Sequence, residues 1–73
     1  MVDERVERLG QELRDRRKSL RLTQDQVADL AGCSQRFVRA LEAGKPGVRL
    51  DKLLDVASVL GLVIELATRS ERR

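Results

Sequence analysis

Hydrophobic residues recur every three or four positions along the first sixty residues, and this spacing predicts four amphipathic helices. The first covers about residues 3–20, and the fourth covers about residues 50–60. Two shorter helices lie between them and end at Gly32 and Gly44, because glycine readily adopts the left-handed conformation that closes a helix. The residues expected on the buried faces are Val6, Leu9, Leu13, Leu20, Val27, Leu30, Ala31, Val38, Leu41, Leu50, Leu53, Leu54, Ala57 and Leu60, with Phe37 beside them.

Gly10 lies inside the first predicted helix, where a glycine costs about 1 kcal/mol relative to alanine. Two interpretations remain open. Either the helix begins only near Leu9, or a neighbouring segment packs so closely against Gly10 that a side chain would not fit.

Two polar residues mark the starts of the short helices. Thr23 is a favourable N-cap, and Gln26 three positions later completes a capping-box pattern. Ser34 caps the next helix, so that only Gly32, Cys33 and Ser34 separate the two. Two helices joined by such a short, glycine-containing turn form a helix-turn-helix, whose second helix can enter the major groove of DNA.

The residues after Gly61 follow a different pattern. They alternate in polarity and are rich in β-branched side chains, which predicts a strand rather than a continuation of the fourth helix. A single strand cannot satisfy its own backbone hydrogen-bonding groups, so we expect it to pair with the same strand of a second copy in a homodimer. The residues of this dimer strand are Leu62, Val63, Ile64, Glu65, Leu66, Ala67 and Thr68.

The length of 73 residues allows a single domain over residues 1–73, with a helical core at about 3–61 and the dimerisation strand at about 62–68. No apolar run could span a membrane, and the charged N-terminus MVDERVER does not resemble a signal peptide, so we expect a cytoplasmic protein. There is no histidine and one cysteine, Cys33, which we interpret as a packed thiol rather than a redox switch. Since a nucleophile–base pair, paired carboxylates and a phosphate-binding glycine loop are also missing, we expect no enzyme activity, metal or cofactor.

Positive charge gathers in the middle of the chain, which has a formal net charge of +3. Residues 14–21 hold five bases and one acid, and residues 34–49 hold four bases and one acid. A charged run is often only a solvated face. Two basic runs within so small a domain favour an anion-binding surface.

The helix that follows Ser34 carries the residues suited to reading DNA bases. Gln35, Arg36 and Arg39 face away from its apolar side, and arginine and glutamine pair with guanine and adenine edges, respectively, in the major groove. We therefore predict that these three residues contact bases. The residues predicted to contact phosphates, at helix starts and in the following loop, are Thr23, Gln24, Ser34, Lys45 and Arg49.

The stretch TQDQVADLAGCSQRFVRALEAG, followed by VRLDKLLDVASVLGL, resembles the XRE/Cro-type helix-turn-helix family over about residues 9–61. The resemblance implies an all-α, lambda-repressor-like bundle of four to five helices. It also implies a structural ion pair between Arg17 and Glu42, which would tie the first helix to the end of the third. Arg36 and Arg39 are larger and more basic than the residues many relatives carry there, so the operator sequence does not transfer.

Within that family, GKPGVRLDKLLDVASVLGLVIEL is most similar to HipB-like antitoxins. This resemblance implies a sequence-specific repressor that is the antitoxin of a type II toxin-antitoxin pair, neutralises a HipA-like kinase toxin and autorepresses its operon. A dimer would place two recognition helices about 34 Å apart on a palindromic, double-stranded DNA operator. The alternatives are a stand-alone XRE-type regulator and a protein-interaction module without specific DNA binding.

Overall fold

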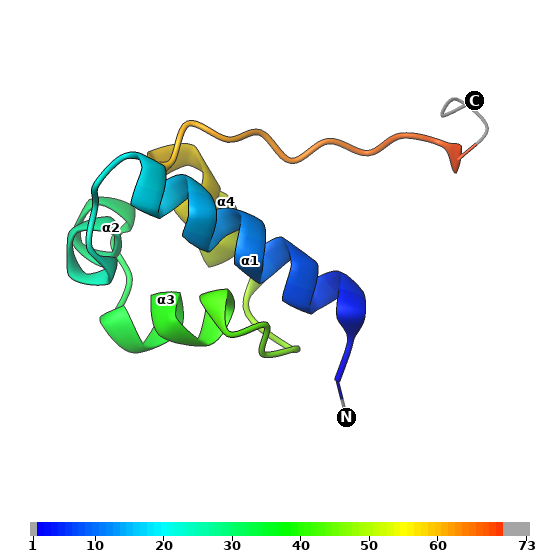
Figure 1. The fold of residues 1–73 in the computed structure, drawn as a ribbon, viewed down its shortest axis with the longest axis horizontal. Coiled ribbons are helices and arrows are strands. Elements are labelled where there is room, and N and C mark those ends of the chain that lie inside the picture. Colours follow the sequence, from blue (N-terminus) through cyan, green and yellow to red (C-terminus); the bar gives the residue numbers. More distant parts are fainter. Residues whose placement is uncertain (1, 70–73) are drawn as a thin grey trace.

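The computed structural model describes residues 2–69 and contains four helices in that range. Figure 1 shows them as a small bundle, and their bounds are α1 (Glu4–Ser19), α2 (Gln24–Ala31), α3 (Gln35–Glu42) and α4 (Leu50–Val59). The all-helical class expected from the sequence is confirmed. Across residues 2–69, no helix combines the length and the apolar character needed to cross a bilayer.

The two short helices begin at the predicted caps. The Oγ1 of Thr23 accepts from the backbone N–H of Gln26 at 3.0 Å, and the Gln26 side chain accepts from the Thr23 N–H at 2.8 Å, so the capping box is confirmed. The Oγ of Ser34 accepts from the N–H of Phe37 at 3.0 Å. Gly32 adopts the left-handed conformation with φ of 70°. These local contacts hold the short turn between α2 and α3.

The core lies where the four helices meet. Its most deeply buried large side chains come from α2, α3, α4 and the residue after α4, and they are Leu41, Leu60, Val27, Val38 and Val56. Ala28 and Ala31 line the inner face of α2, and their small side chains let α3 and α4 approach closely. Because α3 is packed by one face only, its other face is left at the surface.

Four leucines predicted to be buried are exposed instead. The exposed fractions are 39% for Leu20, 66% for Leu30, 65% for Leu50 and 45% for Leu54. Successive residues turn by about 100° around a helix, and the crossing of the neighbouring helices selects which side is covered. On α4 that side is centred on Leu53, Val56 and Ala57.

Helix α1 passes straight through Gly10, so the prediction of a late helix start is wrong and the prediction of a close neighbour is confirmed. A Cβ placed on Gly10 would lie 2.9 Å from the carbonyl oxygen of Glu42 and still closer to that of Leu41. At Gly44, where φ is 79°, a Cβ would lie 2.8 Å from the Cα of Glu7. The first half of α1 therefore packs directly against the backbone at the end of α3.

The chain leaves the bundle after α4 in an extended form. Gly61, with φ of 72°, breaks the helix, and the N–H of Leu62 turns back to donate to the carbonyl of Ala57 at 2.8 Å. Residues 62–68 are not helical, and they form no strand, because residues 2–69 offer no neighbouring strand to pair with. Figure 1 shows this segment leaving on the side of the bundle opposite α3.

Candidate nucleic-acid interface

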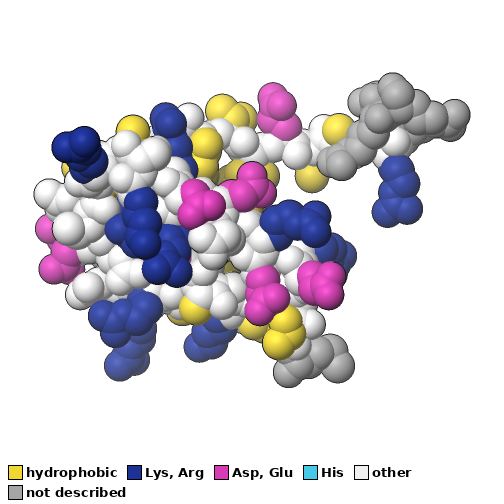
Figure 2. Space-filling model, viewed as in Figure 1, with side chains coloured by type: hydrophobic (Ala, Val, Ile, Leu, Met, Phe, Trp, Pro, Cys, Tyr) yellow, Lys and Arg dark blue, Asp and Glu magenta, His cyan; other side chains and the backbone are white. Residues whose placement is uncertain are grey.

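Helix α3 presents its polar residues along the surface that the bundle leaves free. Val38 and Leu41 face the core, while Arg36 and Arg39 are exposed and Gln35 is half-buried. In Figure 2, lysine and arginine side chains project from the edge of the molecule where α3 runs. The exposed side of α3 therefore carries positive charge, which a DNA-binding surface requires.

The structure separates the two arginines of α3 between different hollows. Arg36 borders a shallow hollow of about 300 Å³ with Phe37, Ala40 and the loop at 45–48. Arg39 borders another, of about 460 Å³, with Gln24 at the start of α2 and with residues of α1. Arg36 and Arg39 therefore line different hollows although they lie on the same helix.

Two of the residues predicted to contact phosphates already act as helix caps. The hydroxyl oxygens of Thr23 and Ser34 accept backbone N–H groups, which leaves each hydroxyl hydrogen free to donate. Both side chains are exposed, as is Lys45. Gln24 uses one of its two amide N–H groups to donate to Oε1 of Glu42 at 3.0 Å. The second N–H can donate to another acceptor.

Arg49 is the exception within the predicted phosphate-contacting set, because it is already paired. Its Nη2 lies 2.6 Å from Oδ2 of Asp51, and its Nε donates to Oδ1 at 3.1 Å. The hydrogen bond from Arg49 lowers the pKa of the Asp51 carboxyl, so the pair is ionised at neutral pH. Asp51, two residues further along the chain, was not singled out from the sequence, although this short spacing could have indicated it.

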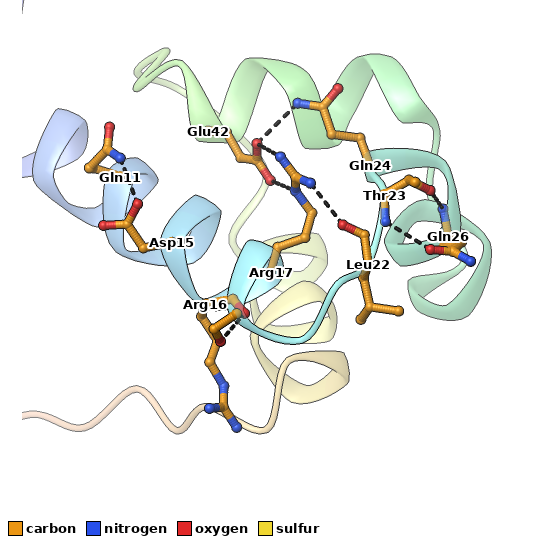
Figure 3. A network of polar contacts seen from close by, with 10 residues as sticks. Gln11, Asp15, Arg16, Arg17, Leu22, Thr23, Gln24, Gln26 and Glu42 are labelled. Atoms are coloured by element: carbon orange, nitrogen blue, oxygen red, sulfur yellow. Dashed lines mark hydrogen bonds and ion pairs between the residues drawn. The ribbon is translucent and has the colours of Figure 1, made fainter.

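A polar network joins the start of α2 to both α1 and α3 (Figure 3). The Nε of Arg17 donates to Oε2 of Glu42 at 2.6 Å, and its Nη2 donates to Oε1 at 3.0 Å. The Nη1 of Arg17 donates to the carbonyl of Leu22 at 2.8 Å. The side chains of Arg17 and Glu42 are only 11% and 6% exposed. The pair inferred from the family resemblance is thus present and buried.

The charge of Glu42 is stabilised inside this network. Burial alone would raise the pKa of its carboxyl, but the hydrogen bonds from Arg17 and Gln24 and the positive charges of Arg17 and Arg14 outweigh burial and lower it. Glu42 is therefore a carboxylate at neutral pH. It holds Gln24, a predicted DNA contact, in a fixed position relative to α3.

Two arginines of α1 were not singled out from the sequence. The Nε of Arg16 donates to the carbonyl of Leu60 at 2.8 Å and so satisfies the end of α4 just before the chain turns outwards. Arg14 lies one helical turn before Arg17 and borders the same hollow as Arg39. The spacing of three residues between Arg14 and Arg17 places both on one side of α1 and is the signal that could have found Arg14.

Comparison with known proteins agrees with this geometry. The family model described as "Helix-turn-helix domain" matches residues 8–69, which is most of the chain. The HTH-type transcriptional regulator y4mF of Sinorhizobium fredii (strain NBRC 101917 / NGR234) is 42% identical over 65 residues, covering 89% of this chain and 86% of that protein. With the capped α2–turn–α3 unit and the buried Arg17–Glu42 pair on the same chain, this protein belongs to the XRE-type helix-turn-helix family.

Proposed function

We propose that this protein binds double-stranded DNA through α3 and regulates transcription as a repressor. The observation that carries the proposal is the placement of α3, which packs on the bundle through Val38 and Leu41 and leaves Arg36 and Arg39 exposed on its other face. The similarity to a protein named as a transcriptional regulator supports the same conclusion.

The proposed contacts divide into two groups. Residues of α3 read bases in the major groove, where a bidentate arginine–guanine contact contributes about 1–3 kcal/mol of discrimination. Residues at the helix starts and in the loop after α3 fix the register on the DNA backbone without reading the sequence. The base group comprises Gln35, Arg36 and Arg39, and the backbone group comprises Thr23, Gln24, Ser34, Lys45 and Arg49.

We also propose that two copies pair through residues 62–68. Residues 63–67 make no backbone hydrogen bond within the described part of the chain, and Leu66 is 100% exposed. Beside them, Leu9, Leu13, Leu62 and Ile64 contribute to a hollow of about 280 Å³ between α1 and the extended segment. A second copy would satisfy the backbone groups and cover the apolar side chains, and a two-fold dimer matches a palindromic operator.

The antitoxin role is the more specific part of the proposal and rests on the similarity of residues 44–66 to HipB-like antitoxins. In that role the protein would bind a HipA-like kinase toxin and repress the operon that encodes both. Co-expression with the product of the adjacent gene tests it. Co-purification of the two proteins supports an antitoxin, and separate elution of two folded proteins supports a stand-alone regulator.

The DNA-binding proposal is tested by fluorescence anisotropy with two duplexes of equal length across a salt series. One carries the DNA directly upstream of this protein's own gene, and the other is a scrambled sequence. We expect tight binding to the first that resists competitor DNA. Equal, weak and steeply salt-dependent binding to both would refute sequence-specific binding and support a protein-interaction module.

A further inference from the structure

A hollow of about 460 Å³ lies between α1, the start of α2 and the exposed side of α3. Arg14 and Arg17 approach it from α1, Gln24 from α2, and Arg39 and Glu42 from α3. Three helices thus place polar side chains around one surface depression. Helix α3 contributes Arg39, which is a predicted DNA contact, and Glu42, which belongs to the polar network with Arg17 and Gln24.

The hollow carries an uncompensated positive charge. Among residues 2–69, Glu42 is the only acid on its lining, and Arg17 neutralises it through two hydrogen bonds. Arg14 and Arg39 have neither an ion-pair nor a hydrogen-bond partner among residues 2–69. Gln24 is fixed by Glu42 and retains one amide N–H to donate. The lining therefore offers two free guanidinium groups and one oriented amide donor.

We propose that this hollow binds one phosphate of the DNA backbone, held by Arg14 and Arg39 with Gln24 as the third donor. The inference rests on the proposed DNA binding and changes the role of Arg39 from reading a base to holding the backbone. It also adds Arg14, which lies on α1 and outside the helix-turn-helix unit. Glu42 acts as a positioning residue, because its carboxylate orients Gln24. Arg17 neutralises this carboxylate, so it does not repel the phosphate.

The chemistry favours a phosphate over a base edge. Guanidinium groups present several N–H donors in a plane and bind the oxygens of a phosphate in a bidentate manner. The amide oxygen of Gln24 is a free acceptor, but the charge of the lining comes from the two unpaired guanidinium groups, which favours an anion over a neutral base edge. The start of α2 beside the hollow adds backbone N–H groups and the positive end of the helix dipole, which also favour an anion.

The test compares three single variants, Arg14→Gln, Arg39→Gln and Arg69→Gln, on the upstream and scrambled duplexes. Each variant loses one positive charge, and Arg69 is an exposed arginine beyond the extended segment, so it controls for net charge. We expect Arg14→Gln and Arg39→Gln to weaken binding to both duplexes by a similar factor. The slope of log affinity against log salt should become shallower by about 0.9 for each protomer bound. Arg69→Gln should leave the slope within error of wild type.

Three outcomes would overturn the assignment. The first is a change in the ratio of affinities for the two duplexes in Arg39→Gln, which would make Arg39 a base reader. The second is a slope in Arg14→Gln that matches the Arg69→Gln control. The third is wild-type affinity for both duplexes in both variants, combined with loss of binding to a co-expressed partner protein, which would assign the hollow to an acidic protein surface. If wild type itself does not distinguish the duplexes, the proposed sequence specificity fails, while the salt slopes still decide whether the hollow holds a phosphate.

Discussion

Arg17 and Glu42 form a buried ion pair between α1 and α3, with Nε of Arg17 2.6 Å from Oε2 of Glu42. Removing one partner leaves the other charge buried and uncompensated, which costs about 3–5 kcal/mol. We therefore expect Glu42→Gln to lower the free energy of unfolding by several kcal/mol in urea denaturation. The matched control is Glu12→Gln, which removes an exposed carboxylate from α1 and should change stability by less than about 0.5 kcal/mol. Equal midpoints for the two variants would contradict a stabilising role for the pair.

The same pair makes stability depend on pH. The pKa of the Glu42 carboxyl is lowered in the folded protein from an ordinary value of 4.5. Its contribution is therefore fully present above pH 4.5 and is lost as the pH falls through the lower, folded pKa. We expect the urea midpoint of wild type to fall in this acidic range and that of Glu42→Gln to fall less. Parallel curves for the two proteins would show that other carboxylates cause the acid sensitivity.

Replacing Gly10 with alanine should destabilise the protein, although the same change in an exposed helix stabilises it by about 1 kcal/mol. The added Cβ would collide with the carbonyl oxygens of Leu41 and Glu42, which belong to backbone that cannot simply rotate away. We expect a loss of about 1–3 kcal/mol in the free energy of unfolding. Glu12→Ala, on an exposed position of the same helix, is the control. A gain in thermal midpoint for Gly10→Ala would mean that α1 and α3 are further apart than described.

Releasing Arg49 from Asp51 should strengthen DNA binding. In the free protein the two side chains pair at 2.6 Å, and both are largely exposed, so Asp51 competes with any phosphate for the guanidinium. We expect Asp51→Asn to raise affinity for DNA several-fold at low salt and to make the salt dependence steeper. Asp55→Asn, which removes another exposed acid from α4, controls for net charge. The same gain in both variants would indicate a general charge effect rather than a contact by Arg49.

Cys33 should behave as an unreactive thiol. Burial raises its pKa from the ordinary value of 9.0, and the nearby charge of Lys52 opposes this only in part. Because the thiolate is the reactive form, we expect alkylation by iodoacetamide at neutral pH to be much slower in the folded protein than in urea. The rate should increase as the pH is raised through the alkaline range. Rapid alkylation of the folded protein would instead favour a redox role.

Features set by local chemistry could be predicted from the sequence. The caps at Thr23 and Ser34 and the helix break at Gly61 each depend on a residue and its immediate neighbours, so their signals lie within a few positions of the chain. The apolar residues at Val38 and Leu41 were also placed correctly, because α3 is short and strongly amphipathic. The family resemblance added the Arg17–Glu42 pair, which connects residues far apart in the sequence.

Features set by helix crossings could not be predicted. Leu30 and Leu54 have the periodicity of buried residues, yet which side of a helix is covered depends on where its neighbours cross it. The division of Arg36 and Arg39 between two hollows has the same origin, since it requires the position of α1 relative to α3. The periodicity of a sequence shows whether one side of a helix is apolar or polar, but it does not show which element packs against that side.

The extended segment after Gly61 leaves the bundle on the side away from α3 (Figure 1). A second chain that paired with residues 62–68 would therefore not compete sterically with DNA on α3. Once one recognition helix is bound, the other would be held near the second half-site at a high effective concentration, and the gain in affinity would come from this avidity without any new contact. Shortening the chain after Gly61 would then weaken binding to a full palindrome far more than binding to an isolated half-site.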